Sequence, residues 1–334
     1  MDWRLSMGTF VGLDIGYSNV ISAHGTSDVD ACDVVIRPAQ ATPLNSFPGD
    51  AGLREGEVVV DVDGEQWVAF AAPGRAQGGR ELHEDYTASA AYKALFKGSL
   101  LLAAGEDDVI DRLVTGLPVS QARDKSYVDS LKARMVGTHQ ISAKRSIEVK
   151  SVEVVAQPIG TLTEIYCGGE HAEMVEESVV LIIDPGFFSV DWVLFDHREL
   201  VATSSNSSLK AMSVLLEACN EEIAKDYGGI PGVEKIEHAL QSGKETIMLY
   251  GKKIQIAEYM EKAASRIIPA VMTEIKQGLR FLKGRAVDCV VLGGGGASVY
   301  ERFARQEFPE AQVLKPKNSV SSNAEGFWRI AIAQ

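Results

Sequence analysis

The sequence predicts an α/β fold made of two similar halves. Three observations predict it. Apolar runs of strand length alternate with longer stretches of helical pattern, and a run of glycines follows a late strand. Each half also opens in the same way, with a strand, an Asp-x-Gly turn and a return strand. The repeated opening indicates a duplication, and 334 residues are enough for two domains of ordinary size.

In the first half, turn signals separate the apolar runs. Residues 10–13 form a strand that ends in the turn 14–16, and residues 20–23 form the return strand. Asp63 and Gly64 favour a type I′ hairpin turn, whereas residues 40–56, rich in Pro, Gly and Ala, are expected to form an exposed loop. The other expected elements are hairpin strands at 57–62 and 65–70, a helix at 87–104, a strand at 112–115, a helix at 120–135 capped by Ser120 and closed by Gly137, and a strand at 147–155.

The second half repeats this opening. Residues 179–183 are apolar and end in the turn 184–186, and residues 190–195 form the return strand. A further strand at 287–292 runs directly into four consecutive glycines. Helices are expected at residues 209–227, 233–242, 256–277, 297–303 and 323–333.

Composition excludes several classes of protein. The chain has 33 Lys and Arg against 46 Asp and Glu, a net charge of −13, and no basic patch, so direct binding to nucleic acid is not expected. The start lacks the apolar core of a signal peptide, and the longest apolar runs are too short to cross a membrane. The four cysteines are far apart in the sequence, which indicates reduced thiols in the cytoplasm and no zinc site.

The two Asp-x-Gly turns predict a phosphate site. An aspartate at the end of a strand can hold a hydrated Mg²⁺, while the N–H groups of the following turn meet phosphate oxygens. One such turn also occurs as a plain hairpin, but two of them about half a chain apart could grip a triphosphate from both sides. The glycine run alternatively suggests a dinucleotide site, yet the G-x-G-x-x-G spacing fails, because Ser298 and Val299 stand at the sixth positions.

These motifs, in this order, resemble the actin, Hsp70 and sugar-kinase superfamily. The family has a first phosphate loop, a first connecting segment, a second phosphate loop, an adenosine loop and a second connecting segment, which match residues 14–19, 157–160, 184–191, 292–296 and 323–326. The resemblance implies duplicated actin-like ATPase domains of the ribonuclease H-like type around a nucleotide cleft. The first domain would comprise residues 1–175 and 320–334, and the second residues 176–319.

Within this superfamily the chain is most similar to the plasmid-segregation actins of the ParM/StbA type. Residues 82–86, 116–119 and 155–158 resemble the D protein of plasmid PRTRC clusters. This likeness implies an ATPase that polymerises with bound nucleotide and disassembles after hydrolysis. Its partners would be further copies of itself and a separate DNA-binding adaptor, with no direct contact to nucleic acid or membrane.

The resemblance also implies a role for each matching residue. Asp14 and Asp184 would hold Mg²⁺ through water, and Gln157 would orient the attacking water. As Gln is no strong base, slow hydrolysis is expected. The other residues expected to contact ATP or ADP, with GTP as an alternative, are Gly16, Tyr17, Ser18 and Asn19 in the first loop, Gly186, Phe187, Ser189 and Asp191 in the second, and Gly293, Gly294, Gly295 and Gly296 in the adenosine loop.

Two departures from the family pattern bear on the hydrolysis rate. Ile21 stands where many relatives have a phosphate-contacting lysine, and Phe187 and Phe188 follow Gly186 where a second glycine is usual. Asp191 could also be an ordinary solvated strand residue. Two further functions remain open on the same fold: a small-molecule kinase, for which the sequence offers no recognisable carboxylate base, and a monomeric nucleotide switch.

Overall fold

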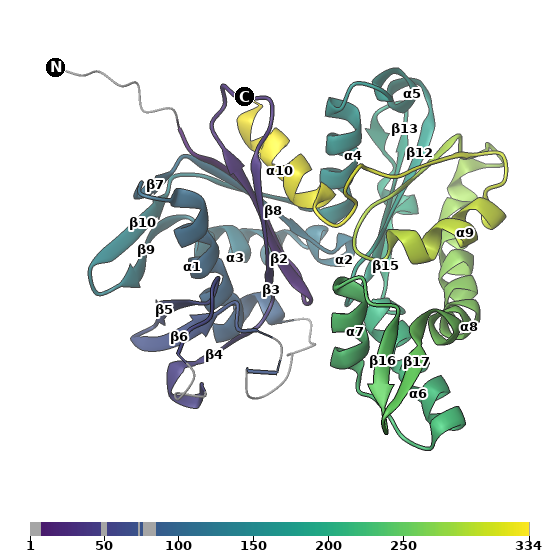
Figure 1. Cartoon of the computed structure of the whole chain (residues 1–334). Coiled ribbons are helices and arrows are strands. Elements are labelled where there is room, and N and C mark those ends of the chain that lie inside the picture. The colour runs from purple at the N-terminus through teal and green to yellow at the C-terminus, as the bar shows by residue number, and fades with distance from the viewer. Residues whose placement is uncertain (1–7, 48–51, 73, 76–84, 334) are drawn as a thin grey trace. The chain divides into compact units, whose positions relative to one another are not determined.

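The structure is a computed structural model that describes residues 8–47, 52–72, 74–75 and 85–333 (Figure 1). The chain divides into two compact units. Unit 1 comprises Met1–Met174 and Pro316–Gln334, and unit 2 comprises Val175–Lys315. The predicted boundaries, after residues 175 and 319, lie close to these. Each unit has its own central sheet.

Unit 1 is built on a five-stranded sheet with the order β11-β8-β1-β2-β3. The strand β1 pairs in parallel with β8, which pairs in parallel with β11, whereas β1, β2 and β3 form an antiparallel meander. The strands span Phe10–Ile15 (β1), Asn19–Gly25 (β2), Asp33–Pro38 (β3), Arg112–Leu117 (β8) and Val152–Ala156 (β11).

Unit 2 repeats the same arrangement. Its sheet has the order β14-β13-β12-β18-β19, with β15 also paired to β13. Here too the first strand of the unit forms an antiparallel hairpin on one side and a parallel pair on the other. The strands span Val179–Pro185 (β12), Val190–Asp196 (β13), Glu199–Leu200 (β14), Asn206–Ser208 (β15), Cys289–Leu292 (β18) and Gln312–Leu314 (β19). The predicted duplicated α/β fold is confirmed.

Alternation along β1 divides the core of unit 1 between two faces. Val11, Leu13 and Ile15 pack with α1 (Ala90–Ala104), whereas Phe10 packs with α10 (Ser322–Ile332). Because successive side chains of a strand point to opposite faces, Asp14 lies on the α10 face of the sheet. The α10 helix closes this face with the large, fully buried side chains of Phe327 and Trp328.

Glycines bring α10 and α4 (Gln157–Cys167) into close contact, as Figure 1 shows. A Cβ on Gly326 would lie 1.8 Å from the carbonyl oxygen of Gly160, so the two helices can approach this closely only with glycine there. Beside the glycines, the Thr161 hydroxyl donates to the Asn323 amide oxygen over 2.8 Å. This buried polar contact fixes the α4–α10 pair.

A buried ion pair organises part of the segment that the sequence predicts as an exposed loop. Glu57 and Arg75 are each 7% exposed and lie 2.7 Å apart, and the guanidinium stacks over Phe47. Within the predicted loop, the short strand β4 (Ala41–Pro43) pairs with β6. The loop prediction is therefore wrong for this part, because residues 41–43 form a strand and Thr42 and Phe47 are buried. The sheet β4-β6-β5 also contains β5 (Val58–Val62) and β6 (Glu65–Ala69), joined by the predicted Asp63–Gly64 turn.

Two further predictions differ from the structure. The predicted helix 120–135 is two helices, α2 (Val119–Ala122) and α3 (Lys125–Met135), because Asp124 caps α3 by accepting from the N–H groups of Ser126 and Tyr127. The predicted strand 147–155 is divided between β10 (Arg145–Val149) and β11, which belong to different sheets. The hairpin of β16 (Thr246–Leu249) and β17 (Lys252–Gln255) was not predicted.

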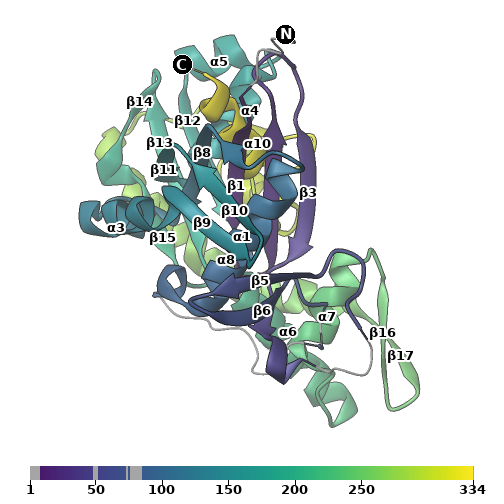
Figure 2. The ribbon, with the colours of Figure 1, turned by 90° about the vertical axis from the view of Figure 1, so that its left-hand side faces the viewer.

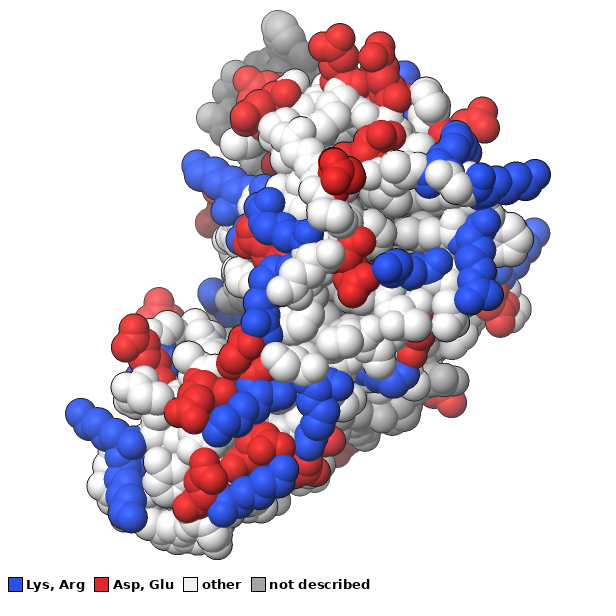
Figure 3. Space-filling view, turned by 90° about the vertical axis from the view of Figure 1, so that its right-hand side faces the viewer, with Lys and Arg blue, Asp and Glu red and all other residues white. Residues whose placement is uncertain are grey.

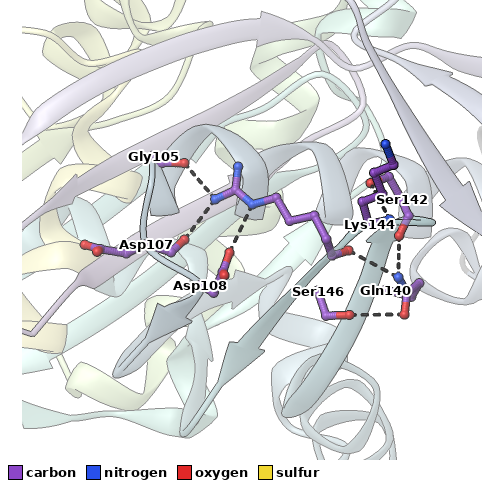
Figure 4. A network of polar contacts seen from close by, with 8 residues as sticks. Gly105, Asp107, Asp108, Gln140, Ser142, Lys144 and Ser146 are labelled. Atoms are coloured by element: carbon purple, nitrogen blue, oxygen red, sulfur yellow. Dashed lines mark hydrogen bonds and ion pairs between the residues drawn. The ribbon is translucent and has the colours of Figure 1, made fainter.

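Arg145 ties a small sheet of unit 1 to the end of α1 (Figure 4). This sheet has the order β7-β10-β9, with β7 at Val109–Ile110 and β9 at Gly137–Ser142. The guanidinium donates to the carbonyl oxygens of Gly105 and Asp107 and to the Asp108 carboxylate, over 2.7 to 3.1 Å. One side chain therefore holds the loop after α1 against the β9–β10 hairpin.

The helices of unit 2 are linked by surface ion pairs. Arg266 on α8 (Ile256–Gly278) contacts Glu221 and Glu222 on α6 (Met212–Tyr227), and Lys276 contacts Glu307 at the end of α9 (Ala297–Glu307). Figure 3 shows basic and acidic side chains interspersed on this face.

The remaining helices are α5 (Ala172–Glu177) and α7 (Val233–Gln241). Among the described residues, no helix has both the length and the apolarity that a bilayer span requires.

Candidate functional site

The first phosphate-loop candidate is a tight turn between β1 and β2. The Gly16 N–H donates to the Asn19 carbonyl oxygen over 3.0 Å, which closes the turn through Tyr17 and Ser18. A Cβ on Gly16 would lie 3.1 Å from that same oxygen, so a larger residue would strain the closure. The turn places Asp14 at the end of β1, opposite Ile21.

The second candidate loop, in unit 2, is closed in the same way. The Gly186 N–H donates to the Ser189 carbonyl oxygen over 2.8 Å, and a Cβ on Gly186 would lie 3.0 Å from that oxygen. Asp184 precedes the turn at the end of β12 and is 5% exposed. The likeness of the two halves therefore extends to one matching hydrogen bond in each turn, and the repeated Asp-x-Gly pattern predicted the two turns.

Gln157 and Asp14 are brought together within unit 1. The side-chain nitrogen of Gln157, the first residue of α4, donates to Asp14 Oδ1 over 3.0 Å. A carboxylate only accepts, so this contact fixes the orientation of the amide and directs its oxygen, an acceptor, away from Asp14. Gly116 in β8 makes room for the side chain, since a Cβ there would lie 2.8 Å from Gln157 Cγ.

Tyr17 packs against the protein through an aromatic stack. Its ring lies 4.4 Å from that of Tyr86 with an interplanar angle of 25°, and Tyr86 meets Tyr92 edge to face at 5.3 Å. Burial, followed by the nearby Tyr86 and Asp14, raises the pKa of Tyr92, so this phenol stays neutral. The stack fixes the first turn to the residues before α1. Sequence reasoning included Tyr86 only as the last residue of the stretch 82–86 and gave it no part in the site.

Asp191 lies on β13 opposite Asp184 and is 1% exposed. The hydroxyls of Ser189 and Ser207 donate to its two carboxylate oxygens. The alternative of an ordinary solvated strand residue is wrong, because Asp191 is buried. In this arrangement Asp191 orients Ser189, and Ser207, which the sequence did not single out, completes the site.

The backbone of the second turn is fixed by α6. The first N–H groups of that helix, at Met212 and Ser213, donate to the carbonyl oxygens of Gly186 and Phe187 over 3.1 and 2.9 Å. The Phe187 side chain packs against the hydrophobic core of unit 2. The bulky residue that replaces the usual glycine is thus partly accommodated by the core.

The glycine run connects β18 to α9 and lies against the second turn. The N–H groups of Gly293 and Gly296 donate to the carbonyl oxygens of Ile183 and Pro185 over 3.0 and 2.9 Å. Gly294 has φ +68°, and a Cβ there would lie 2.1 Å from Asp184 Oδ1. By contrast, a Cβ on Gly295 would meet nothing within 4 Å. Asp184, the second turn and the adenosine-loop candidate therefore form one cluster in unit 2.

Some predicted positions and motifs lie outside these clusters. Residues 82–84 of the stretch 82–86, on which part of the narrower PRTRC resemblance rests, lie outside the described residues. Among the described residues, no three His, Cys, Asp or Glu side chains gather closely enough to hold a metal ion by themselves.

Comparisons with known proteins agree with this architecture. The family described as "Actin like proteins N terminal domain" matches residues 12–160, and "Archaeal actin homologue MreB-like, C-terminal" matches residues 182–305. No curated protein matches the sequence.

Solved structures of the same fold include the archaeal actin homolog Ta0583 in complex with ADP. It is 18% identical with a TM-score of 0.71, over 97% of this chain and 99% of that one. A 15-stranded ParM filament from Clostridium botulinum is 17% identical with a TM-score of 0.71, again over 97% and 99% of the two chains. The actin-like protein Alp7A is 16% identical with a TM-score of 0.72, over 97% and 95%. Since each unit matches an actin-type family and both carry the same sheet and turn, the chain belongs to the actin-like proteins.

Proposed function

We propose that this protein binds ATP with Mg²⁺, hydrolyses it slowly, and polymerises into filaments that segregate plasmid DNA. The observation that carries the proposal is the hydrogen bond between Gln157 and Asp14. It pairs the residue proposed to orient the attacking water with one proposed to hold the hydrated Mg²⁺. The ADP complex of Ta0583 and the ParM filament support nucleotide binding and self-association, respectively.

Nucleotide binding would use the two closed turns and the glycine run. In each turn, glycine allows the backbone to approach a phosphate group closely, and N–H groups can then donate to its oxygens. The carboxylates of Asp14 and Asp184 are hard oxygen ligands, which suit Mg²⁺ held through its water shell. When bound, the metal ion would neutralise charge on the phosphate oxygens. The glycine run, with Gly295 facing open space, would lie under the adenosine.

Slow hydrolysis follows from the chemistry of Gln157. Its amide nitrogen is engaged by Asp14, so the amide oxygen would accept a hydrogen bond from the attacking water and orient it. An amide cannot remove a proton at neutral pH. Catalysis would therefore depend on positioning and charge stabilisation, as is typical of phosphoryl transfer. A slow reaction suits a filament that must persist before it disassembles.

In the cytoplasm, such a filament would move DNA through a separate adaptor. With a net charge of −13, the chain as a whole repels the phosphate backbone, so contact with DNA would pass through a basic partner protein. GTP is an alternative nucleotide, because the loop proposed to lie beside the base consists of glycines, which have no side chains to distinguish guanine from adenine.

The direct test is right-angle light scattering after Mg²⁺-ATP is added to the purified protein, with electron microscopy of the same samples. We expect a rise that depends on nucleotide and on protein concentration, together with visible filaments. Phosphate release measured in parallel should lag behind the rise. ATP binding without any rise over a wide concentration range would contradict the filament proposal and favour the small-molecule kinase or the monomeric switch.

Three variants separate the proposed roles. Asp184→Ala should weaken Mg²⁺-dependent turnover, and unchanged turnover would contradict the assignment of this site. Gln157→Ala should slow hydrolysis about 10²-fold or more while sparing nucleotide affinity, so that filaments last longer. Gln140→Ala is a matched control, because this exposed glutamine lies on β9 and, within the described residues, forms its hydrogen bonds inside its own hairpin. Equal turnover of the two glutamine variants would refute the role of Gln157.

A further inference from the structure

The edge strand β3 of unit 1 carries an exposed apolar stripe. It pairs with β2 on one side, and within the described part of the chain no strand pairs with its other side (Figure 2). Val34 and Ile36 are 38% and 39% exposed. An edge strand of this kind offers its backbone to a strand of another chain, which proteins usually prevent with charges, proline or a covering segment.

The outward backbone groups of β3 belong to Val34 and Ile36. The Ala39 N–H donates to the Ser18 carbonyl oxygen over 3.0 Å, which extends the ladder between β3 and β2. Since backbone groups alternate in direction along a strand, those of residues 33, 35 and 37 also face β2, and those of residues 34 and 36 face outward. Pro38 takes the next outward position, where its missing N–H interrupts no ladder.

Arg37 occupies this edge without using all its donors. Its guanidinium donates to the carbonyl oxygen of the preceding Ile36 over 3.1 Å, one of the two outward acceptors. Its Nε lies against Gly56 and has no hydrogen-bond partner within the described residues. A buried donor without a partner is uncommon in a native structure. A new acceptor for Arg37 would therefore both satisfy the guanidinium and release the Ile36 carbonyl.

The strand is complementary to itself. It reads Asp33-Val-Val-Ile-Arg37, with opposite charges two residues on either side of Val35. When a second copy lies antiparallel about a two-fold axis at Val35, Asp33 faces the partner's Arg37, and Val34 faces the partner's Ile36. Opposite charges and apolar pairs are the cross-strand combinations that stabilise a sheet. The outward N–H and C=O groups of Val34 and Ile36 then meet those of the partner strand.

We propose that β3 is a two-fold interface through which two copies of this chain join their sheets edge to edge. Arg37 moves from the Ile36 carbonyl to the carboxylate of the partner's Asp33 as the pair forms. The interface is isologous and closes on itself, unlike the head-to-tail contact that extends a filament. It requires no nucleotide, so it is independent of the filament proposal and would join two filaments where these exist.

A disulfide test fixes the register. At the two-fold axis the Cα atoms of Val35 and the partner's Val35 should lie about 4.5 Å apart, within the range of a disulfide. The Cα atoms of Val34 and the partner's Val34 should be about 8 Å apart, which is too far. In a Cys32→Ser/Cys167→Ser background without nucleotide, mild oxidation should cross-link Val35→Cys at least about tenfold faster than Val34→Cys. Equal cross-linking, or none in either variant, would overturn the proposal.

A charge swap tests the ion pairs in the otherwise native chain. Sedimentation velocity without nucleotide should show a monomer–dimer equilibrium. Asp33→Arg or Arg37→Asp alone should raise the dimer dissociation constant roughly tenfold, because like charges then face each other twice in each dimer. The double variant Asp33→Arg/Arg37→Asp restores opposite charges and should recover native dimerisation, which excludes misfolding as the cause. A monomer at all concentrations, dimers insensitive to the single changes, or no recovery in the double variant would each refute this interface.

Discussion

Replacing Gly294 by alanine tests the cluster formed by Asp184 and the glycine run. The added Cβ would lie 2.1 Å from Asp184 Oδ1 and 3.1 Å from the Pro185 carbonyl oxygen. Gly294 also has φ +68°, in the left-handed region that an alanine occupies at a cost. Gly295→Ala is a matched control in the same loop, because a Cβ there would meet nothing within 4 Å.

The expected loss of stability has two parts. The left-handed backbone costs an alanine about 1 kcal/mol. Displacing the buried Asp184 carboxylate or shifting the loop adds about 1–3 kcal/mol, as is usual for overpacking. Gly294→Ala should therefore lower the free energy of unfolding by about 2–4 kcal/mol, whereas Gly295→Ala should change it by less than about 0.5 kcal/mol.

Urea denaturation measures the stability change, and titration with Mg²⁺-ATP measures its effect on the site. If Asp184 holds the metal ion as proposed, its displacement in Gly294→Ala should weaken nucleotide affinity at least about tenfold, which corresponds to about 1.4 kcal/mol. Gly295→Ala is the control for stability only, because its methyl group would enter the open space proposed for the adenosine. Equal stability of the two variants would refute the packing argument. Native affinity in Gly294→Ala together with lowered stability would refute only the role of Asp184.

Three other predictions concern unit 1 and are checked by urea or thermal denaturation. Gly326→Ala should lower the free energy of unfolding by at least about 3 kcal/mol, since its Cβ would lie 1.8 Å from a backbone oxygen of α4. Gly25→Ala is its control and should be tolerated, because a Cβ on Gly25 meets only ordinary van der Waals contacts. Asp124→Ala should lower the melting temperature through loss of the α3 cap, and no change would contradict the assignment of that cap. Burial alone would raise the pKa of Glu57, but the N–H groups of Ala72 and Arg54 and the Arg75 guanidinium together lower this pKa below 4.5. The ionised Glu57 therefore stabilises the folded state above pH 4.5, and this stabilisation is lost as pH falls through the lowered pKa. Glu57→Gln should therefore be less stable at pH 7 and lose less stability in acid than the native protein, and parallel pH profiles would contradict this account.

Local signals predicted the fold well where one segment determines its own structure. The turns after Asp14 and Asp184 close through a bond between residues three apart, so the Asp-x-Gly pattern and its flanking apolar runs suffice to locate them. The same holds for the Asp63–Gly64 hairpin, in which both residues have the positive φ that a type I′ turn requires. The duplication follows from these turns, because the same local pattern opens both halves.

Predictions failed where distant segments decide the outcome. The segment around Phe47 has a loop-like composition, yet Phe47 is buried because it packs with β6 residues and under Arg75, which is distant in the sequence. Ser120 and Asp124 are both good caps, and no local rule decides between them. Similarly, no local signal gave Tyr86 or Ser207 a part in the site. Their place beside Tyr17 and Asp191 depends on packing that only the folded chain shows.

The contact between Gln157 and Asp14 also gives a physical reason for glutamine at this position. A glutamate there would place two carboxylates about 3 Å apart, and one of them would then bind a proton near neutral pH. Either Asp14 would lose the charge proposed to hold the hydrated Mg²⁺, or the new residue would be neutral and gain nothing as a base. A neutral amide avoids this conflict, because it donates to Asp14 and still presents an oxygen to water. The proposed slow hydrolysis would thus follow from keeping a charged aspartate beside the residue proposed to orient the water, and a faster enzyme on this framework would need its base at a different position.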